Sequence, residues 1–378
     1  MFELSEDHEA FRKVVRDFAE RELAPHVARW DEEHHFPVEA VLAMGELGLF
    51  GLVFPEEWGG GGGNFASLCV AIEEIGRIDQ SLGITLSAGV GLGANPIYRF
   101  GDDEQKQRWL PDLIAGRALG AFGLTEPGGG SDAGATTTRA RREGDDWVLD
   151  GAKAFITNCG TPITSVITVT ARTDDGISSF VIEAGTPGLV VEPPYRKLGW
   201  HASDTHGLAL DGCRVPANHL LGQLGAGFRN FLSILDDGRI AISALALGCA
   251  RACLEQSVEY AQERHAFGRP IGANQAIAFA LADLAVAVEN ATNLTYKAAW
   301  LREHGRPIGQ AAAMAKLYST EAAVSATRVA TQVFGGAGFI EETPVARFYR
   351  DAKILEIGEG TSEIQRLVLA RGLGLPVV

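Results

Sequence analysis

Basic residues are scarce in this chain. Its 378 residues include 33 lysines and arginines against 48 aspartates and glutamates, so the formal net charge is -15. A protein that binds nucleic acid neutralises phosphates with a basic surface. The acidic balance therefore excludes nucleic acid as the main ligand, although a local basic pocket could still hold an anionic small molecule.

A secretory leader and a membrane span are also missing. The N-terminal residues 1–7 are acidic and polar, without the basic segment and apolar stretch of a signal peptide. No run of unbroken apolar residues is long enough to cross a bilayer. We therefore expect a cytoplasmic protein with no transmembrane segment.

Cysteine is rare as well. The chain has five cysteines, and none of them has neighbours at the spacing of a metal site. Cys249 and Cys253 lie one helical turn apart in an apolar run, which is typical of core residues. We predict that these two cysteines are core residues, and we predict no metal site.

The pattern of apolar residues divides the chain into helical, strand-rich and helical parts. Residues 119–226 carry short β-rich runs, and Asp150-Gly151 and Asp211-Gly212 look like tight turns between them. The flanking parts follow helical spacing. We predict a mainly helical α+β fold with an N-terminal helical domain (1–118), a middle antiparallel β-barrel or sandwich (119–226) and a C-terminal four-helix bundle (227–378).

One glycine motif resembles a dinucleotide fingerprint but lacks its setting. Residues 89–94, Gly-Val-Gly-Leu-Gly-Ala, fit G-x-G-x-x-A. Pro96 follows almost at once, and no second strand comes after it. We predict small residues packed between helices instead.

Other short segments combine glycines with hydroxyl, aromatic and charged side chains. Glycines let a backbone approach a ligand closely and offer its N–H groups to ligand oxygens. Any one of these segments could be an ordinary surface turn. They are Leu124–Gly134 (LTEPGGGSDAG), Phe155–Asn158 (FITN), Glu263–Ile271 with Gln275, Gln332–Phe339 (QVFGGAGF) and Arg350–Arg366, which ends in EGTSEIQR.

In this order, the segments closely resemble the acyl-CoA dehydrogenase family. The resemblance covers essentially the whole chain, and TEPGGGSD, FGGAGF and EGTSEIQR are its most specific parts. It implies an FAD-dependent enzyme that oxidises an acyl-CoA thioester to the trans-2-enoyl-CoA, as in fatty acid β-oxidation. It also implies a homotetramer that passes electrons to an electron-transfer flavoprotein. An acyl-CoA oxidase or a dehydrogenase of carrier-bound acyl groups would share the fold.

The resemblance also assigns FAD contacts, between domains and across subunits. Phe155 replaces a tryptophan of many members and keeps an aromatic plane, whereas Ala266 replaces a hydroxyl or amide side chain. The implied residues along the flavin ring and ribityl chain are Phe122, Leu124, Thr125, Gly130, Ser131, Phe155 and Thr157. Those for the adenosine half are Arg264, Phe267 and Gln275 from a neighbouring subunit, with Gln332, Gly335 and Gly336; Gly360, Thr361 and Glu363 also touch the cofactor.

Glu359 is the implied catalytic base that removes the α-proton of the thioester. A minority of the family keeps its base at the position of Gly238, which here can remove no proton. A buried carboxyl group has a raised pKa, which suits proton abstraction near neutral pH. The implied substrate contacts are Ser131, Leu235, Asp236, Arg239, Gly358 and Gly360. Without the resemblance, Glu359 would be an ordinary solvated loop carboxylate.

Two local features around Glu359 lead to further expectations. Ser362 with Gln365 resembles a capping box, which predicts a helix N-terminus just after the base and N–H groups near the enolate oxygen. Gly358 stands where most members carry tyrosine. The missing ring leaves space for a branched or bulky acyl group, unless Leu235 or Phe339 fills it.

Overall fold

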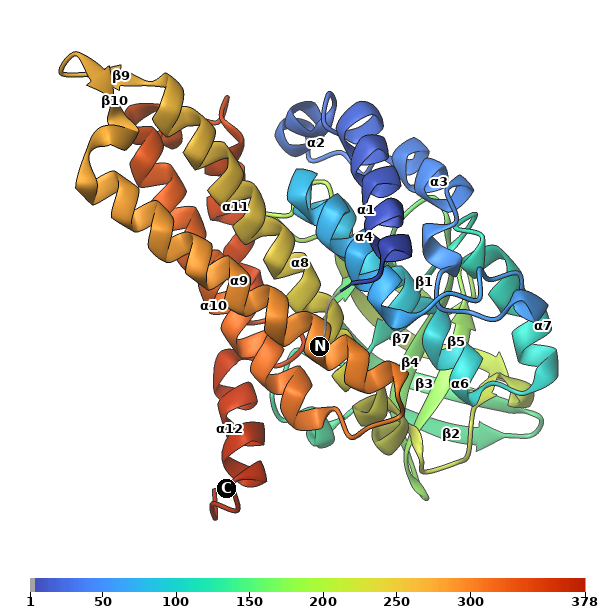
Figure 1. The fold of residues 1–378 in the computed structure, drawn as a ribbon. Helices are drawn as coiled ribbons and strands as arrows, with labels where there is room; N and C mark the ends of the chain where they lie inside the picture. Colours follow the sequence, from blue (N-terminus) through green and yellow to red (C-terminus); the bar gives the residue numbers. More distant parts are fainter. Residues whose placement is uncertain (1–3, 378) are drawn as a thin grey trace.

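The computed structural model describes residues 4–377, which begin with a helical region (Figure 1). Ser5 caps the first helix, and the helical path breaks near Pro25, where α1 gives way to a short π-helical turn and then to α2. The helices of this region are α1 (Glu6–Phe18), α2 (Val27–Glu33), α3 (Val38–Glu46), α4 (Phe65–Ile78), α5 (Gln80–Ala88), α6 (Asn95–Phe100) and α7 (Asp103–Ile114).

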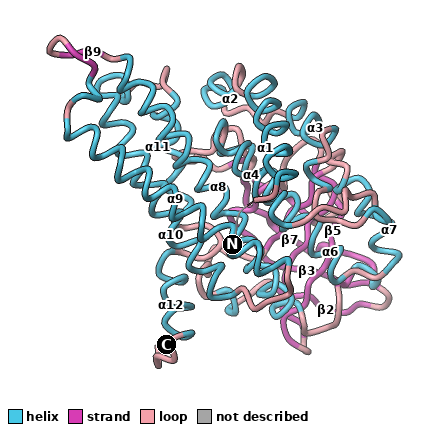
Figure 2. The backbone as a smooth tube through the Cα atoms, viewed as in Figure 1, coloured by secondary structure: helices cyan, strands magenta, loops and turns pink. Residues whose placement is uncertain are grey.

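A single twisted sheet follows, shown in magenta in Figure 2. Its order is β6-β7-β3-β2-β4-β5-β8, with β1 paired to β4. The predicted β domain, an antiparallel barrel or sandwich, is confirmed as a largely antiparallel sheet, although the sheet is not closed and β1 runs parallel to β4. The strands are β1 (Leu119–Gly123), β2 (Arg139–Glu143), β3 (Asp146–Thr157), β4 (Thr164–Thr173), β5 (Gly176–Glu183), β6 (Leu189–Pro194), β7 (Thr205–Pro216) and β8 (Leu220–Leu221).

The two predicted tight turns are wrong, because both dipeptides lie inside long strands. Asp150-Gly151 is part of β3 and Asp211-Gly212 part of β7, where the two strands pair with a shift in register. Asp150 Oδ1 accepts a hydrogen bond from Gly212 N (2.7 Å). A Cβ on Gly151 would lie 2.6 Å from Thr138 Oγ1. Glycine here therefore serves a β-bulge with close packing and not a chain reversal.

Long helices return after the sheet. The helices α8, α9 and α10 lie side by side, and the shorter α11 and α12 pack on α10 (Figures 1 and 2). The elements are α8 (Gly227–Glu263), the hairpin β9 (His265–Ala266) and β10 (Arg269–Pro270), α9 (Gln275–Glu303), α10 (Gly309–Phe334), α11 (Pro344–Ala352) and α12 (Ser362–Gly372). The helix–sheet–helix order is as predicted, while the boundaries at 118/119 and 226/227 stay predictions.

Helix α9 is long and apolar enough to cross a membrane by length and composition alone. The core helix of a soluble protein passes the same test, so this is weak evidence for a span. Phe279 and Val286 expose more than half of their surface on this helix. The five cysteines are free and buried, which confirms the predicted core positions of Cys249 and Cys253.

The glycines of residues 89–94 form a π-helical turn and not a nucleotide-binding loop. A Cβ on Gly93 would lie 2.7 Å from the carbonyl oxygen of Gly120 in β1. The prediction of close packing by small residues is confirmed, although Gly93 packs on a strand and not on another helix. This contact joins the N-terminal helices to the sheet.

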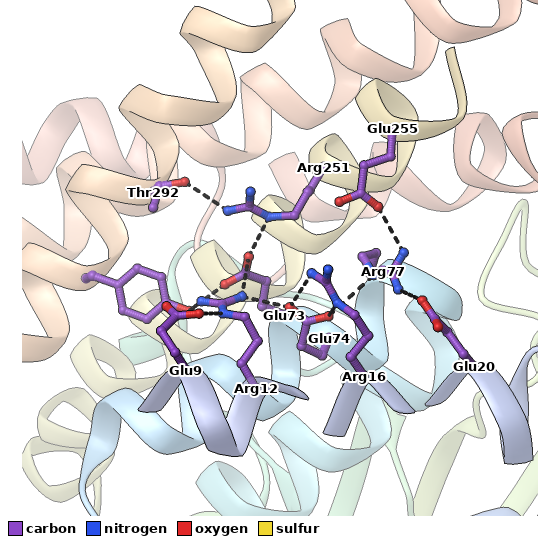
Figure 3. A network of polar contacts seen from close by, with 11 residues as sticks. Glu9, Arg12, Arg16, Glu20, Glu73, Glu74, Arg77, Arg251, Glu255 and Thr292 are labelled. Carbon is purple, nitrogen blue, oxygen red and sulfur yellow. Dashed lines mark hydrogen bonds and ion pairs between the residues drawn. The ribbon is translucent and has the colours of Figure 1, made fainter. Parts of the chain in front are cut away.

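A buried charge network fixes α4 between α1 and the C-terminal helices (Figure 3). The side chains of Glu73 and Glu74 on α4 are fully buried. Glu74 accepts hydrogen bonds from Arg12 Nη1 (2.7 Å) and Arg16 Nε (2.8 Å), and Glu73 accepts one from Arg251 Nε of α8 (2.8 Å). Buried carboxylates are tolerated only with such partners. The network therefore sets the position of α8, which carries part of the site described next.

Candidate active site

Glu359 lies in a tight turn between α11 and α12. Its φ is 52°, in the left-handed region that non-glycine residues rarely adopt, and the next residue, Gly360, has φ 93°. Gln365 of α12 donates a hydrogen bond from Nε2 to the carbonyl oxygen of Gly360 (2.9 Å), and a longer one to that of Glu359 (3.4 Å). The turn is thus held by side chains that bind its carbonyl groups.

The carboxyl group of Glu359 packs directly against Gly238 of α8. A Cβ on Gly238 would lie 1.9 Å from Glu359 Oε2 and 2.9 Å from its carboxyl carbon. No side chain larger than that of glycine fits at 238 while Glu359 keeps this position. The two residues that the family resemblance names as alternative base positions therefore share one space.

Glu359 as a whole residue is partly exposed, but its carboxyl group is removed from water. Oε2 is buried and has no hydrogen-bond partner within residues 4–377. Burial raises the pKa of Glu359 to about 7, while the positive charges of Lys316 and Arg239 oppose the rise. A carboxyl group with this pKa can accept a proton near neutral pH.

The aspartates beside Gly238 are held in ion pairs. Arg239 Nη1 donates to Asp236 Oδ1 (2.6 Å), and Arg302 Nη2 donates to Asp237 Oδ2 (3.2 Å). Arg239 keeps its Nε buried without a hydrogen-bond partner in the described chain. Neither aspartate has the buried, unpaired carboxyl oxygen that Glu359 has, so Glu359 is the better candidate for a base.

Lys316 is a site residue that the sequence reasoning missed. Its side chain is fully buried on α10, and Nζ donates to the carbonyl oxygen of Gly360 (2.8 Å). Ala312, Ala315 and Ser319 are buried around it on the same helix. A lone lysine among small residues at helical spacing was the available signal, because such a face is otherwise apolar.

The predicted capping box at Ser362 is wrong in detail. Helix α12 does begin at Ser362, but Thr361 is its N-cap and accepts a hydrogen bond from Ile364 N (3.3 Å). Gln365 binds carbonyl groups of the turn and not the cap N–H. The helix N-terminus still follows Glu359 directly, as the motif predicted.

The glycine-rich loop after β1 is organised by a buried ion pair that was also missed. Lys153 Nζ of β3 donates to Glu126 Oε1 (2.8 Å) and to the carbonyl oxygen of Leu124 (3.2 Å). Thr137 N donates to Oε2 of the same carboxylate (2.7 Å), and Thr138 N donates to Oε1 (3.0 Å). Burial disfavours the ionised form, but these bonds outweigh it and lower the pKa of Glu126 to about 2.

The residues implied for the flavin ring lie close to this loop. Ala154 N donates to the carbonyl oxygen of Thr125 (2.8 Å), so the loop runs beside Phe155 and Thr157 at the end of β3. Phe155 has φ 60° and exposes 67% of its surface. Phe122 of β1 packs on Phe231 of α8, with ring centroids 5.0 Å apart, one helical turn before Leu235. These contacts place the sheet edge next to the Gly238 segment.

The residues implied for the adenosine half lie elsewhere in the chain. Arg264 and Phe267 are exposed at the β9–β10 hairpin, where Phe267 is fully exposed, and Gln275 is exposed at the start of α9. Gly335 and Gly336 adjoin this end, because Phe334 stacks on Tyr260 with ring centroids 4.2 Å apart. Figure 1 shows the hairpin at the end of the bundle that points away from the sheet. A single chain therefore does not bring the two groups together.

Family models match the chain in consecutive segments. The acyl-CoA dehydrogenase N-terminal domain matches residues 5–117, the middle domain residues 121–213 and the C-terminal domain residues 225–374. Among curated proteins, "Probable acyl-CoA dehydrogenase YngJ" of Bacillus subtilis is 49% identical, covering 98% of this chain and 99% of the relative. The mitochondrial short-chain specific acyl-CoA dehydrogenase of Rattus norvegicus is 47% identical over 97% of this chain and 90% of its own.

Solved structures also match this chain over nearly its whole length. Butyryl-CoA dehydrogenase from Megasphaera elsdenii matches with a TM-score of 0.96 at 42% identity, covering 99% of both chains. A chain from work on the electron transferring flavoprotein of Acidaminococcus fermentans matches with a TM-score of 0.96 at 43% identity, also over 99% of both. A glutaryl-CoA dehydrogenase from Mycobacterium smegmatis in complex with FADH2 has a TM-score of 0.95 at 34% identity, over 98% of this chain and 95% of that one.

Replacing Gly238 by alanine should displace the Glu359 carboxyl group, because the added methyl group would occupy the same space. Misplacing a reacting group by about 1 Å can cost about 10²-fold in rate. We expect Gly238→Ala to oxidise acyl-CoA thioesters about 10²-fold more slowly than the wild type. Gly61→Ala is the control, since a Cβ there meets only atoms at 3.9 Å or beyond. Equal rates for the wild type and Gly238→Ala would refute the shared-space account.

Proposed function

The chain belongs to the acyl-CoA dehydrogenase family, and from that premise we propose that Glu359 removes the α-proton of a short acyl-CoA thioester. The reaction class is FAD-dependent α,β-dehydrogenation of an acyl-CoA. The observation that supports Glu359 is its buried, unpartnered carboxyl oxygen against Gly238 in the described structure. The short-chain assignment rests on the short-chain and butyryl-CoA relatives.

The surroundings of Glu359 suit the removal of a weakly acidic proton. A base works best when its pKa lies near the working pH, and burial brings the pKa of Glu359 to about 7. The thioester oxygen gains negative charge as the proton leaves and needs nearby donors. We assign one of these to the backbone N–H of Glu359. We assign the substrate side to Arg239 and Asp236, which form an ion pair, with Leu235 and Ser131.

The residues that would hold FAD have the character that the group requires. A flavin ring needs an exposed flat surface, which Phe155 offers at the sheet edge. A Cβ on Gly128 or Gly130 would meet no described atom within 4 Å, so the loop backbone is open to a ligand. FAD, when bound, takes the β-hydride at its N5 atom. Leu124, Thr125, Thr157, Gly360, Thr361 and Glu363 complete our assignment on this side.

The electron acceptor and the location are further parts of the proposal. We propose that the electron acceptor is an electron-transfer flavoprotein. In support, this chain has nearly the same fold as a chain from structural work on such a flavoprotein.

A cytoplasmic location agrees with five cysteines that are all free and buried, since disulfides are rare in that compartment. A prolyl carrier-protein oxidase shares the fold at 33% identity, so aerobic turnover without an added acceptor would favour the oxidase alternative.

Glu359→Gln keeps the shape of the side chain but cannot accept the proton. A positioned general base contributes about 10²–10⁴-fold to a rate. We expect anaerobic bleaching of the bound flavin by butyryl-CoA to slow by at least about 10²-fold, with FAD content unchanged. Stopped-flow absorbance at a common pH measures the rate of flavin bleaching in the wild type and in Glu359→Gln. Bleaching near the wild-type rate would show that another residue is the base.

Gly358 should decide how well the pocket accepts branched acyl groups. A Cβ there would make one ordinary contact, 3.5 Å from the carbonyl oxygen of Ile354, so there is space for the first atom of a larger side chain. Each methylene-sized group in an apolar pocket changes kcat/KM by about 10–200-fold. We expect branched thioesters to be used at least as well as linear ones, and Gly358→Tyr to lose the branched class selectively. The comparison uses thioesters of equal carbon count, and an equal loss of both classes would contradict it.

We propose that the complete FAD site is shared between subunits of a homotetramer. The hairpin with Arg264 and Phe267, followed by Gln275, lies away from the sheet edge of its own chain, and α9 leaves Phe279 and Val286 exposed. A second copy of the chain would cover both. Gln332, Gly335 and Gly336 belong to the same group of contacts.

Substitutions in the hairpin should therefore reduce FAD content although they lie far from Glu359. We expect Arg264→Ala with Gln275→Ala to lose most bound FAD, while the wild type purifies as a tetramer with one FAD per chain. Light scattering and the flavin spectrum measure both quantities. A stable monomer that holds FAD would contradict the shared site.

A further inference from the structure

We propose that Lys316 is a positioning residue for the reaction, which holds the Glu359–Gly360 turn and keeps a positive charge beside the catalytic carboxylate. The inference rests on the proposed role of Glu359. It concerns a side chain on α10 that none of the sequence motifs contains. Lys316 reaches the turn from behind and contacts a backbone carbonyl group, so it acts through Glu359 and not on the substrate.

The burial of Lys316 is the first observation. Its side chain is fully buried, and taking an ammonium group out of water is costly unless the charge is compensated. A hydrogen bond from Nζ to a neutral carbonyl oxygen, at 2.8 Å, compensates only in part. Methionine or leucine would fill the space without this cost. The positive charge of Lys316 therefore stabilises a negative charge close to it. We assign that negative charge to the buried carboxyl group of Glu359.

The charges around the turn single out Lys316. Arg239 also faces Glu359 from α8, but its guanidinium is bound to Asp236 at 2.6 Å. On the other side, Glu356 is bound to Lys353 at 2.5 Å, and Glu363 lies on the exposed face of α12. Of the two cations that stabilise ionised Glu359, Lys316 makes the larger contribution. Burial lowers the pKa of Lys316 to about 8, so its ammonium persists while Glu359 ionises near pH 7.

The structure separates the charge of Lys316 from its hydrogen bond. Gln365 donates to the same Gly360 oxygen from Nε2, at 2.9 Å, and carries no charge. Removing Gln365 therefore loosens the turn but leaves the electrostatic field. Replacing Lys316 by glutamine keeps an uncharged N–H donor group at this position but raises the pKa of Glu359, because the ionised form loses the positive charge of Lys316.

The experiment measures anaerobic flavin reduction by butyryl-CoA between pH 5.5 and 9.5 in FAD-loaded variants. For Lys316→Gln we expect the midpoint of the pH profile to rise by about one unit, which makes reduction about tenfold slower at pH 6 and nearly equal above pH 9. Lys316→Arg should keep the wild-type midpoint. Gln365→Met should lower the rate at every pH without moving the midpoint.

An unshifted midpoint in Lys316→Gln would overturn the proposal, as would an equal shift in Lys316→Arg, since the effect would then not follow the charge. If Lys316→Gln does not fold, Lys316→Met removes the charge while filling the apolar space and carries the same expectation. The variant Glu359→Gln distinguishes a failure of the proposed base from a failure of the proposed role of Lys316. If Glu359→Gln reduces flavin at the wild-type rate, Glu359 is not the base. If Glu359→Gln is slow but the midpoint of the pH profile is unshifted in Lys316→Gln, only the role of Lys316 is refuted.

Discussion

The contact between Gly238 and the carboxyl group of Glu359 is the constraint on which the site depends. It exists because α8 and the turn before α12 approach so closely that a Cβ would lie 1.9 Å from Oε2. That approach depends in turn on α4, where a Cβ on Gly248 of α8 would lie 2.3 Å from the carbonyl oxygen of Glu73. The buried ion pairs of Glu73 and Glu74 hold α4 in this place. The ion pairs of α4 therefore support the helix against which the carboxyl group of Glu359 packs.

Two buried carboxylates in this fold have opposite properties for a clear physical reason. Glu126 accepts hydrogen bonds from Lys153, Thr137 and Thr138, and its pKa falls to about 2. Glu359 is buried with Oε2 unbonded within residues 4–377, and its pKa rises to about 7. Burial acts in the same direction on both, so the number of donors decides the outcome. The first carboxylate organises a loop and stays ionised, while the second can exchange a proton.

The sequence predicted the helix–sheet–helix order, the core positions of Cys249 and Cys253 and the location of Glu359 beside a helix N-terminus. These follow from periodicity and from short motifs that are contiguous in the chain. The wrong or missing predictions concern residues whose structural role depends on contacts with residues that are distant in the sequence. Asp150-Gly151 looked like a turn because its bulge is visible only against β7. Lys316 passed unnoticed because its partner, Gly360, is 44 residues away. The parallel pairing of β1 with β4, inside a domain predicted to be antiparallel, is likewise set by a partner that is distant in the sequence.

The central claim is that Glu359 is a buried acid that ionises near neutral pH and not at the pH of an exposed glutamate. Infrared difference spectroscopy between wild type and Glu359→Gln measures this directly, because the C=O stretch of a protonated carboxyl group is separate from that of a carboxylate. The substitution also isolates Glu359 from Asp351, whose pKa burial likewise raises to about 7. We predict a protonated-carboxyl band that is specific to the wild type and disappears between about pH 6 and pH 8. Loss of that band already at about pH 4 to 5, where exposed glutamates ionise, would contradict the account.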